Sequence, residues 1–490
     1  MDALLSTGAL PVGGFPDYDI DNSLKFESDN GERIQSTNLG SHSSGGNQKW
    51  TLSCWVKRTE ISTSSNHSGI LNFQVNTGTT VSWQFCADSS NEALFQTIHD
   101  STMYTYSRTT AVFKDTAAWY HCMWVVDSTE SAAADRSIVY VNGVRQELEA
   151  GHSSHPLNIA TQNQTFPVQS THYIGGYDGG NNGFRGYIAD YYYLDGIAAG
   201  PTDFGRYDSN GVWVAKAYGG SFGNCGYFLE FQDASNLGKD TGPNTHGNFS
   251  HYGGSAIDQA TDTPTNNFCT MNINARTNGN IRTQEGGTYV TTDGGSGWCS
   301  MLGTMGMSAG KWYWEALVND NGDALTVYVG IAPHNDPYVP HHQTGYYLGN
   351  VETAGSMGWY LSDGSNKNQN GSWGNPGRGD KIMFAYDADN YKMYYGINGT
   401  WGNSANPANG TGSVTAISTY WMSAIHNALD FVLPAVTVYQ GKHMKGFNFG
   451  GYCAWTISSG NTDANGYGNF EYAPPSGFYA LCSKNLAQYG

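Results

Sequence analysis

Paired carboxylates are the first residues in this sequence whose type and spacing could do chemistry. Glu147 and Glu149 alternate along the chain, so a strand would display both on one face. A retaining glycosidase needs two carboxyl groups about 5–5.5 Å apart. This pair, however, follows a predicted hairpin in a surface-like pattern, and Asp190 and Asp195 flank a Tyr-rich stretch whose ends we expect to be exposed. We therefore expect no enzymatic activity from these carboxylates.

Metal-ligand chemistry has two further candidates. His341 and His342 stand in a Pro-rich stretch, and the absence of ligand spacing favours a solvated loop over metal or ligand contact. The Gly-rich segment with Asp178, Asn181 and Asn182 could offer oxygen ligands to calcium. A polar turn that needs Gly and Asn for positive φ explains the same residues and is favoured. We expect no cofactor, and calcium is the one candidate ion.

Aromatic residues give the stronger indication of binding. Tyr346, Tyr347, Trp359, Trp373 and Trp401 lie in or beside segments rich in Gly, Asn and Ser. A flat ring beside amide and hydroxyl groups suits the C–H face of a sugar or the loop of a partner protein. Ordinary core packing is the alternative for these five candidate ligand-binding residues, and the sequence leaves both open.

The elements that position these residues are predicted to be strands. The chain has 490 residues, with 64 Gly, 33 Tyr and 14 Trp, and only 13% of its residues are charged. One hydrophobic core rarely serves more than roughly 250–300 residues, so we expect two or three domains. Glycine suits tight turns and aromatic rings suit a pleated face. The composition therefore predicts an all-β chain.

Strand-like runs and turns divide the chain into four regions. Residues 1–22 form a turn-rich leader that is a candidate attachment segment, and strand signals then fill residues 23–200. Residues 201–277 read as a Gly/Asn-rich connector with few strands, before a second strand-rich block at residues 278–490. Asn-Gly pairs at Asn142 and Asn398 predict tight hairpins. We expect two antiparallel, jelly-roll-like β-sandwiches joined by the connector.

Charge and cysteine usage limit the partners. The formal net charge is −18, which disfavours nucleic acid and anionic membranes. The first sixteen residues lack the pattern of a signal peptide, and no run of eighteen apolar residues predicts a membrane span. None of the eight Cys forms a Cys-x-x-Cys pair, so we expect mostly reduced thiols and no structural zinc.

Four motifs in the first block resemble those of laminin-G-like, concanavalin-type lectin sandwiches. They are residues 50–58 (WTLSCWVKR), 119–121 (WYH), 140–143 (YVNG) and 184–196 (FRGYIADYYYLDG). This resemblance covers roughly residues 22–200 and implies a lectin-like sandwich.

A narrower resemblance extends through the connector. The segments that carry it are 23–26 (SLKF), 54–58 (CWVKR), 211–213 (GVW), 227–231 (YFLEF), 237–240 (LGKD) and 262–268 (DTPTNNF). Together they resemble tail-fibre and virion proteins of marine bacteriophages over about residues 22–272, and this resemblance implies a virion protein.

The second block resembles a SPRY domain, a compact sandwich that binds ligands through loops at one end and is not an enzyme. The matching strands are residues 310–315 (GKWYWE), 329–332 (VGIA), 379–382 (GDKI) and 392–399 (KMYYGING). Ile397 departs from the pattern, because an aromatic residue is commoner at that position.

Together these observations predict a non-enzymatic tail fibre or spike that recognises a glycan or receptor on the host surface. It would assemble in the host bacterial cytoplasm, bind other virion proteins, and form a homo-oligomer, with a trimer favoured by the resemblance. Two alternatives stay open. The chain could be a structural or decorating virion component, or a depolymerase of host polysaccharide.

Overall fold

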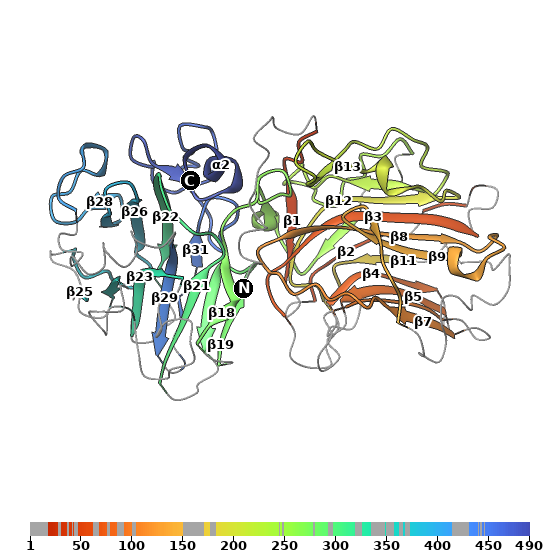
Figure 1. Cartoon of the computed structure of the whole chain (residues 1–490), viewed down its shortest axis with the longest axis horizontal. Coiled ribbons are helices and arrows are strands. Elements are labelled where there is room, and N and C mark those ends of the chain that lie inside the picture. Colours follow the sequence, from red (N-terminus) through yellow and green to blue (C-terminus); the bar gives the residue numbers. More distant parts are fainter. Residues whose placement is uncertain are drawn as a thin grey trace. The chain divides into compact units, whose positions relative to one another are not determined.

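The computed structural model contains two compact units, with the division between Thr265 and Asn266 (Figure 1). We call the described residues up to Thr265 the first unit and those from Asn266 the second unit. The structure describes residues 18–27, 31–36, 39–41, 43, 48–61, 68–75, 79–85, 93–99, 104–149, 171–176, 183–244, 246, 249–277, 280–292, 297–318, 326–334, 348, 357–361, 366–367, 373–413, 431–439, 441, 443–444 and 446–490.

The first unit is built on two antiparallel sheets. The order of the first sheet is β10-β9-β8-β3-β12-β1-β17, with β15 also paired to β12. Its strands are β1 (Ser23–Phe26), β3 (Lys49–Arg58), β8 (Trp119–Asp127), β9 (Ser137–Val141), β10 (Val144–Arg145), β12 (Gly186–Asp195), β15 (Tyr227–Leu229) and β17 (Gln259–Ala260).

The second sheet of this unit has the order β16-β2-β11-β4-β5-β6-β7. Trp83 of this sheet lies 6.1 Å, between ring centroids, from Trp124 of the first sheet. Both rings are buried in the same hydrophobic cluster, so the two sheets enclose one core as a sandwich. The strands are β2 (Arg33–Gln35), β4 (Ser68–Val75), β5 (Thr79–Phe85), β6 (Leu94–His99), β7 (Tyr104–Arg108), β11 (Thr171–Ile174) and β16 (Ser250–Tyr252).

The predicted hairpin at Asn142 joins β9 to β10. Asn142 and Gly143 have φ angles of 49° and 78°, the left-handed pair that a two-residue hairpin requires. A Cβ on Gly143 would come within 2.4 Å of the Trp213 ring. Trp213 begins β14 (Trp213–Ala215), which pairs with β13 (Gly205–Tyr207). Gly143 therefore allows both the tight turn between β9 and β10 and the close packing of the β13–β14 hairpin against that turn.

Short strands occupy the stretch 201–277 that the sequence predicts as a connector. β13 to β17 have two or three residues each. Within this stretch, β15 pairs with β12, β16 with β2 and β17 with β1. The segment up to Thr265 therefore completes both sheets of the first unit.

A buried ion pair fixes the last part of this segment to the sandwich. The Nζ of Lys57 lies 2.6 Å from the Oδ2 of Asp262, and both side chains are at most 1% exposed. Trp119 donates its indole N–H to Oδ1 of the same carboxylate at 3.0 Å, and Ser23 donates to the Asp262 carbonyl at 2.6 Å. β1, β3 and β8 thus all contact one residue that follows β17.

The second unit also has two main antiparallel sheets, with a three-stranded sheet β19-β20-β30 beside them. The main orders are β18-β21-β29-β23-β24-β25 and β28-β27-β26-β22-β31, and β32 adds to β22 in parallel. The elements are β18 (Met271–Arg276), β19 (Ile281–Gln284), β20 (Tyr289–Thr292), β21 (Trp298–Gly303), β22 (Lys311–Leu317), β23 (Val327–Pro333), β24 (Met357–Tyr360), β25 (Asn366–Lys367), β26 (Lys381–Asp387), β27 (Lys392–Ile397), β28 (Thr400–Trp401), β29 (Val432–Tyr439), β30 (His443–Met444), β31 (Gly446–Asn448), β32 (Tyr479–Ala480) and α2 (Ser483–Tyr489).

Aromatic rings fill the space between the two main sheets of the second unit. Trp359 of β24 lies 5.2 Å from Tyr395 of β27, between ring centroids. Asn398 and Gly399 have φ angles of 48° and 83° and join β27 to β28, as the second Asn-Gly pair predicts. Among the described residues α2 is the one α-helix, and the prediction of an all-β chain with two antiparallel sandwiches is confirmed.

The cysteines lie inside the two units. Seven of them are described, and each is a buried thiol; Cys86 lies outside the described residues. Burial raises the pKa of the Cys122 thiol well above its ordinary value. Across the described ranges, no helix has the length and apolar character needed to cross a membrane.

We predict that Asp262→Asn destabilises the first unit strongly. The substitution keeps the shape of the side chain but removes the negative charge that lies 2.6 Å from the buried Lys57 ammonium. Losing one partner of a buried pair costs about 3–5 kcal/mol of unfolding free energy, measured by urea denaturation. Asp135→Asn is the control, because its pair with Arg145 is nearly half exposed, and its denaturation midpoint should not move. Equal midpoints for the two variants would contradict the assignment.

Candidate functional site

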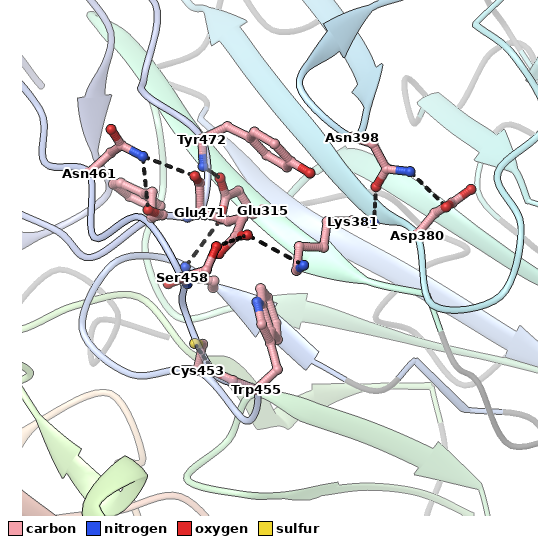
Figure 2. A network of polar contacts seen from close by, with 12 residues as sticks. Glu315, Asp380, Lys381, Asn398, Cys453, Trp455, Ser458, Asn461, Glu471 and Tyr472 are labelled. Carbon is pink, nitrogen blue, oxygen red and sulfur yellow. Dashed lines mark hydrogen bonds and ion pairs between the residues drawn. The ribbon is translucent and has the colours of Figure 1, made fainter.

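A polar network surrounds a buried carboxylate on β22 of the second unit (Figure 2). Glu315 is fully buried, and burial raises the pKa of its carboxyl group despite the donors that surround it. Both carboxylate oxygens accept hydrogen bonds. The donors are Tyr472 N (2.7 Å) and Tyr313 Oη (2.8 Å) to Oε1, and Glu471 N (2.9 Å) and Asn448 Nδ2 (3.3 Å) to Oε2.

A second carboxylate, that of Glu471, adjoins this network in Figure 2. It accepts from the N and Oγ of Ser458 at 2.7 and 2.6 Å, and Lys381 Nζ lies 3.5 Å from it. Burial alone would raise the pKa of Glu471, but these hydrogen bonds and the lysine charge outweigh it and lower the pKa. The two acids therefore differ in pKa, as acid and base pairs do. The carboxylate oxygens of Glu315 and Glu471, however, already accept hydrogen bonds from other residues of the protein. Both acids therefore hold the C-terminal segment in place.

A Ser–His contact in the first unit has the elements of a nucleophile but the wrong tautomer. His121 Nε2 lies 2.8 Å from Ser53 Oγ, and Trp213 donates its indole N–H to His121 Nδ1 at 3.1 Å. Burial lowers the pKa of His121 to about 3, so the ring is neutral and its proton is on Nε2. That nitrogen donates to Ser53 and cannot take its proton. The contact fixes Trp213 rather than activating a serine.

A cluster of side chains of the types that bind metal ions lies between β1, β2 and β16. One ligand atom each from Glu32, His251 and Asp258 lies within 4.8 Å of the others. The Nζ of Lys25 reaches Asp258 Oδ1 at 2.8 Å and Glu32 Oε2 at 3.4 Å, and His251 Nε2 lies 3.2 Å from Glu32 Oε1. The lysine thus already neutralises these carboxylates, and the group forms a buried ion network.

Two further segments have the residue spacing of catalytic motifs but not their structural setting. Glu27 and Glu32 stand in Glu-x-Asp-x-x-Glu spacing, but they flank the turn after β1 rather than sharing a strand. Arg185 Nε lies 3.2 Å from Glu27 Oε1. Residues 219–223 (GGSFG) have Gly-x-Ser-x-Gly spacing, yet Ser221 is an exposed residue of an irregular segment that leads to strand β15 and not to a helix, so it lacks the strand–turn–helix of a nucleophile elbow.

Two acids expected at exposed strand ends are buried instead. Asp195 is 0% exposed, and its Oδ2 accepts from Ser43 N at 2.8 Å. Asp190 is 4% exposed and lies at a register shift in β12 with φ 43°. It accepts from Tyr18 Oη at 2.9 Å. The expectation was wrong because β12 is a central strand, paired on both sides by β1 and β3.

The structure separates the five aromatic candidates. Trp359 and Trp373 are 0% and 1% exposed, so both rings belong to the core and are covered by protein on their faces. Trp401 is half-buried at the end of the β27–β28 hairpin. Tyr346 and Tyr347 lie outside the described residues.

The remaining candidates add no further site. Asp178, Asn181 and Asn182, the calcium candidates, lie outside the described residues, as do His341 and His342. Among the paired carboxylates, Glu149 forms an ion pair with Arg108 and Glu147 is exposed.

A match to a known protein family agrees with the predicted lectin-like sandwich of the first unit. Residues 29–196 match the laminin G model of the concanavalin A-like lectin/glucanases superfamily, less than half of the chain. The first unit therefore carries a concanavalin A-like lectin domain. Among curated proteins, none matches the chain in sequence.

Solved structures resemble parts of the chain at low identity. The SPRY domain of human HERC1 has 14% identity and a TM-score of 0.25, covering 36% of this chain and 94% of its own. A heptameric SAP-like pentraxin from Limulus polyphemus has 15% identity and a TM-score of 0.27, covering 37% and 79%. Domain 4 of AbnA, an extracellular arabinanase from Geobacillus stearothermophilus, has 17% identity and a TM-score of 0.27, covering 39% and 82%.

We predict that Asp190 makes the stability of the first unit pH-dependent. Burial, with the charges of Glu230 and Asp21, raises the pKa of Asp190 to about 7 from 3.8, although the hydrogen bond from Tyr18 opposes the shift. A raised folded-state pKa stabilises the protein below pH 3.8, and this contribution is lost as pH rises to about 7.

The test compares Asp190→Asn with the wild type from pH 4 to 8, because Asn stays neutral and tolerates positive φ. The variant should gain unfolding free energy relative to the wild type, at up to about 1.4 kcal/mol per pH unit. A difference that stays constant over this range would refute the role of Asp190.

We also predict that Glu315→Gln destabilises the second unit. The amide nitrogen of Gln cannot accept a hydrogen bond, so at least one of the main-chain donors at Glu471 and Tyr472 loses its acceptor. A buried donor without a partner costs about 1–3 kcal/mol, measured by denaturant unfolding. An unfolding free energy equal to that of the wild type would contradict the anchoring role.

Proposed function

We propose that this chain is a non-enzymatic, glycan-binding component of a bacteriophage particle, a tail fibre or spike exposed on the virion. The single observation that carries the glycan-binding part is the match of residues 29–196 to the concanavalin A-like lectin/glucanases superfamily. Because that superfamily includes both lectins and glucanases, the side chains must decide between binding and hydrolysis.

The polar networks support binding without catalysis. The carboxylate of Glu315 accepts from main-chain donors, and the cation of Lys25 lies against Glu32. The His121–Ser53 contact has the proton on the nitrogen that faces the serine. Each of these groups is held by partners within the protein, whereas general acid–base catalysis needs a group within reach of a substrate proton.

The phage setting is supported by the sequence resemblance of residues 22–272 and by the thiols. Seven buried cysteines suit assembly in a reducing bacterial cytoplasm. We propose that other virion proteins and a glycan of the host surface are the partners, and that the chain forms a homotrimer. With 23 Lys and Arg against 41 Asp and Glu, neutral glycans suit its surface better than acidic ones.

Binding and hydrolysis are separated by one experiment on the full chain. We predict that it binds neutral oligosaccharides on a glycan array and releases no oligosaccharide from purified host polysaccharide. Release of oligosaccharide that is lost in Glu32→Gln would establish the depolymerase instead. Binding to neither glycans nor host cells would favour a purely structural virion component.

The proposed location on the phage particle can be tested separately. Antibodies against the full chain should label purified phage particles from the culture that produces the protein, as seen by electron microscopy. A chain that is abundant in the lysate but absent from the particles would refute the virion assignment.

A further inference from the structure

We propose that the glycan is bound on the second unit, at a surface formed by Trp401, Tyr472, Asn398 and Asp380, which we call the hairpin surface. The ligand class is a neutral pyranose with adjacent free hydroxyl groups. This inference rests on the proposed function, and it assigns recognition to a part of the chain that lies outside the lectin match of residues 29–196.

Two glycines bring the hairpin close to the two rings. A Cβ on Gly396 would lie 3.2 Å from Cε3 of Trp401, and one on Gly399 would lie 3.1 Å from Cδ1 of Tyr472. Both rings are half-buried and pack on the same cluster of core residues. Each ring is thus packed against the core and accessible in part, which suits stacking on the C–H face of a sugar with little loss of rotamer entropy.

The polar groups of the hairpin surface are oriented by hydrogen bonds. Asn398 is exposed; its Oδ1 accepts from Lys381 N at 2.9 Å, and its Nδ2 donates to Asp380 Oδ1 at 2.7 Å. Asp380 Oδ2 in turn accepts from Gly377 N at 2.6 Å. These contacts fix which end of the amide is nitrogen. The second N–H of the amide and the other lone pairs of the carboxylate match a donor and an acceptor on adjacent hydroxyls.

Glu315 positions the aromatic side of this surface from within. It accepts from the main-chain N–H of Tyr472 at 2.7 Å, and Figure 2 shows the Tyr472 ring extending from that anchor toward Asn398. Burial, followed by the charges of Glu471, Glu315 and Asp380, raises the pKa of Tyr472, so the ring lies within the electrostatic reach of Asp380. The surface is therefore organised before any ligand arrives, a condition for affinity in a small site.

The surroundings favour a sugar over a protein partner. Protein interfaces bury about 800 Å² on each side and use contiguous apolar patches. Among the described residues, all the large hydrophobic side chains that are exposed belong to the first unit; they are Val112, Val144, Tyr207, Val212 and Tyr252. The hairpin surface instead combines two partly covered rings with an amide and a carboxylate, which is the chemistry of a small polyhydroxy ligand.

The test uses the full chain on an array of neutral glucose-, galactose- and mannose-containing oligosaccharides. Trp401→Ala should weaken binding at least tenfold. Asn398→Asp should do likewise, because it removes the amide donor and places a second negative charge beside Asp380, while Asp tolerates the positive φ at this exposed turn. The second variant leaves the core untouched, so its loss of binding cannot be ascribed to misfolding of the packed ring.

Tyr207→Ala is the matched control, because Tyr207 is an exposed aromatic residue of the first unit, at 51% exposure. Its affinity should equal that of the wild type. If Trp401→Ala and Asn398→Asp bind as the wild type does, the hairpin surface is not the site, and the proposed function stands. If the wild type binds none of the glycans, the proposed function and this inference both fail.

Discussion

The buried carboxylate of Glu315 is the interaction on which the second unit depends. Its two oxygens accept the main-chain N–H groups of Glu471 and Tyr472, residues more than 150 positions away in the chain. A charge without such donors could not stay in the interior, since burial of an unsatisfied carboxylate is prohibitive. The C-terminal segment is therefore held on β22, and the same contact sets the Tyr472 ring beside the β27–β28 hairpin. In the first unit the Lys57–Asp262 pair has the corresponding role for the segment after β17.

Local backbone chemistry made the fold class predictable from the sequence. Asn142 and Asn398 each precede a glycine, and both pairs adopt the left-handed angles of a tight hairpin. Short strand-like runs separated by turn residues indicated sandwiches, and the sheets confirm this. The burial of Asp190 and Asp195 was not predictable in this way, because it depends on β12 being central in its sheet, and sheet order is set by pairing between distant segments.

The candidate site was predictable only in part. Gly/Asn-rich flanks singled out Trp401, Trp359 and Trp373 alike, yet the last two fill the core. Composition near a residue does not report which side of the strand its side chain occupies, and these flanks suit a turn in either case. Tyr472 gave no signal at all, since its place follows from the distant carboxylate of Glu315.

A structure of the full chain bound to a neutral oligosaccharide would test directly whether the hairpin surface is the glycan site. We expect a pyranose ring against Trp401 and Tyr472, with adjacent hydroxyls hydrogen-bonded to Asn398 and Asp380. A glycan bound on the first unit, with the hairpin surface empty at saturating ligand, would contradict it.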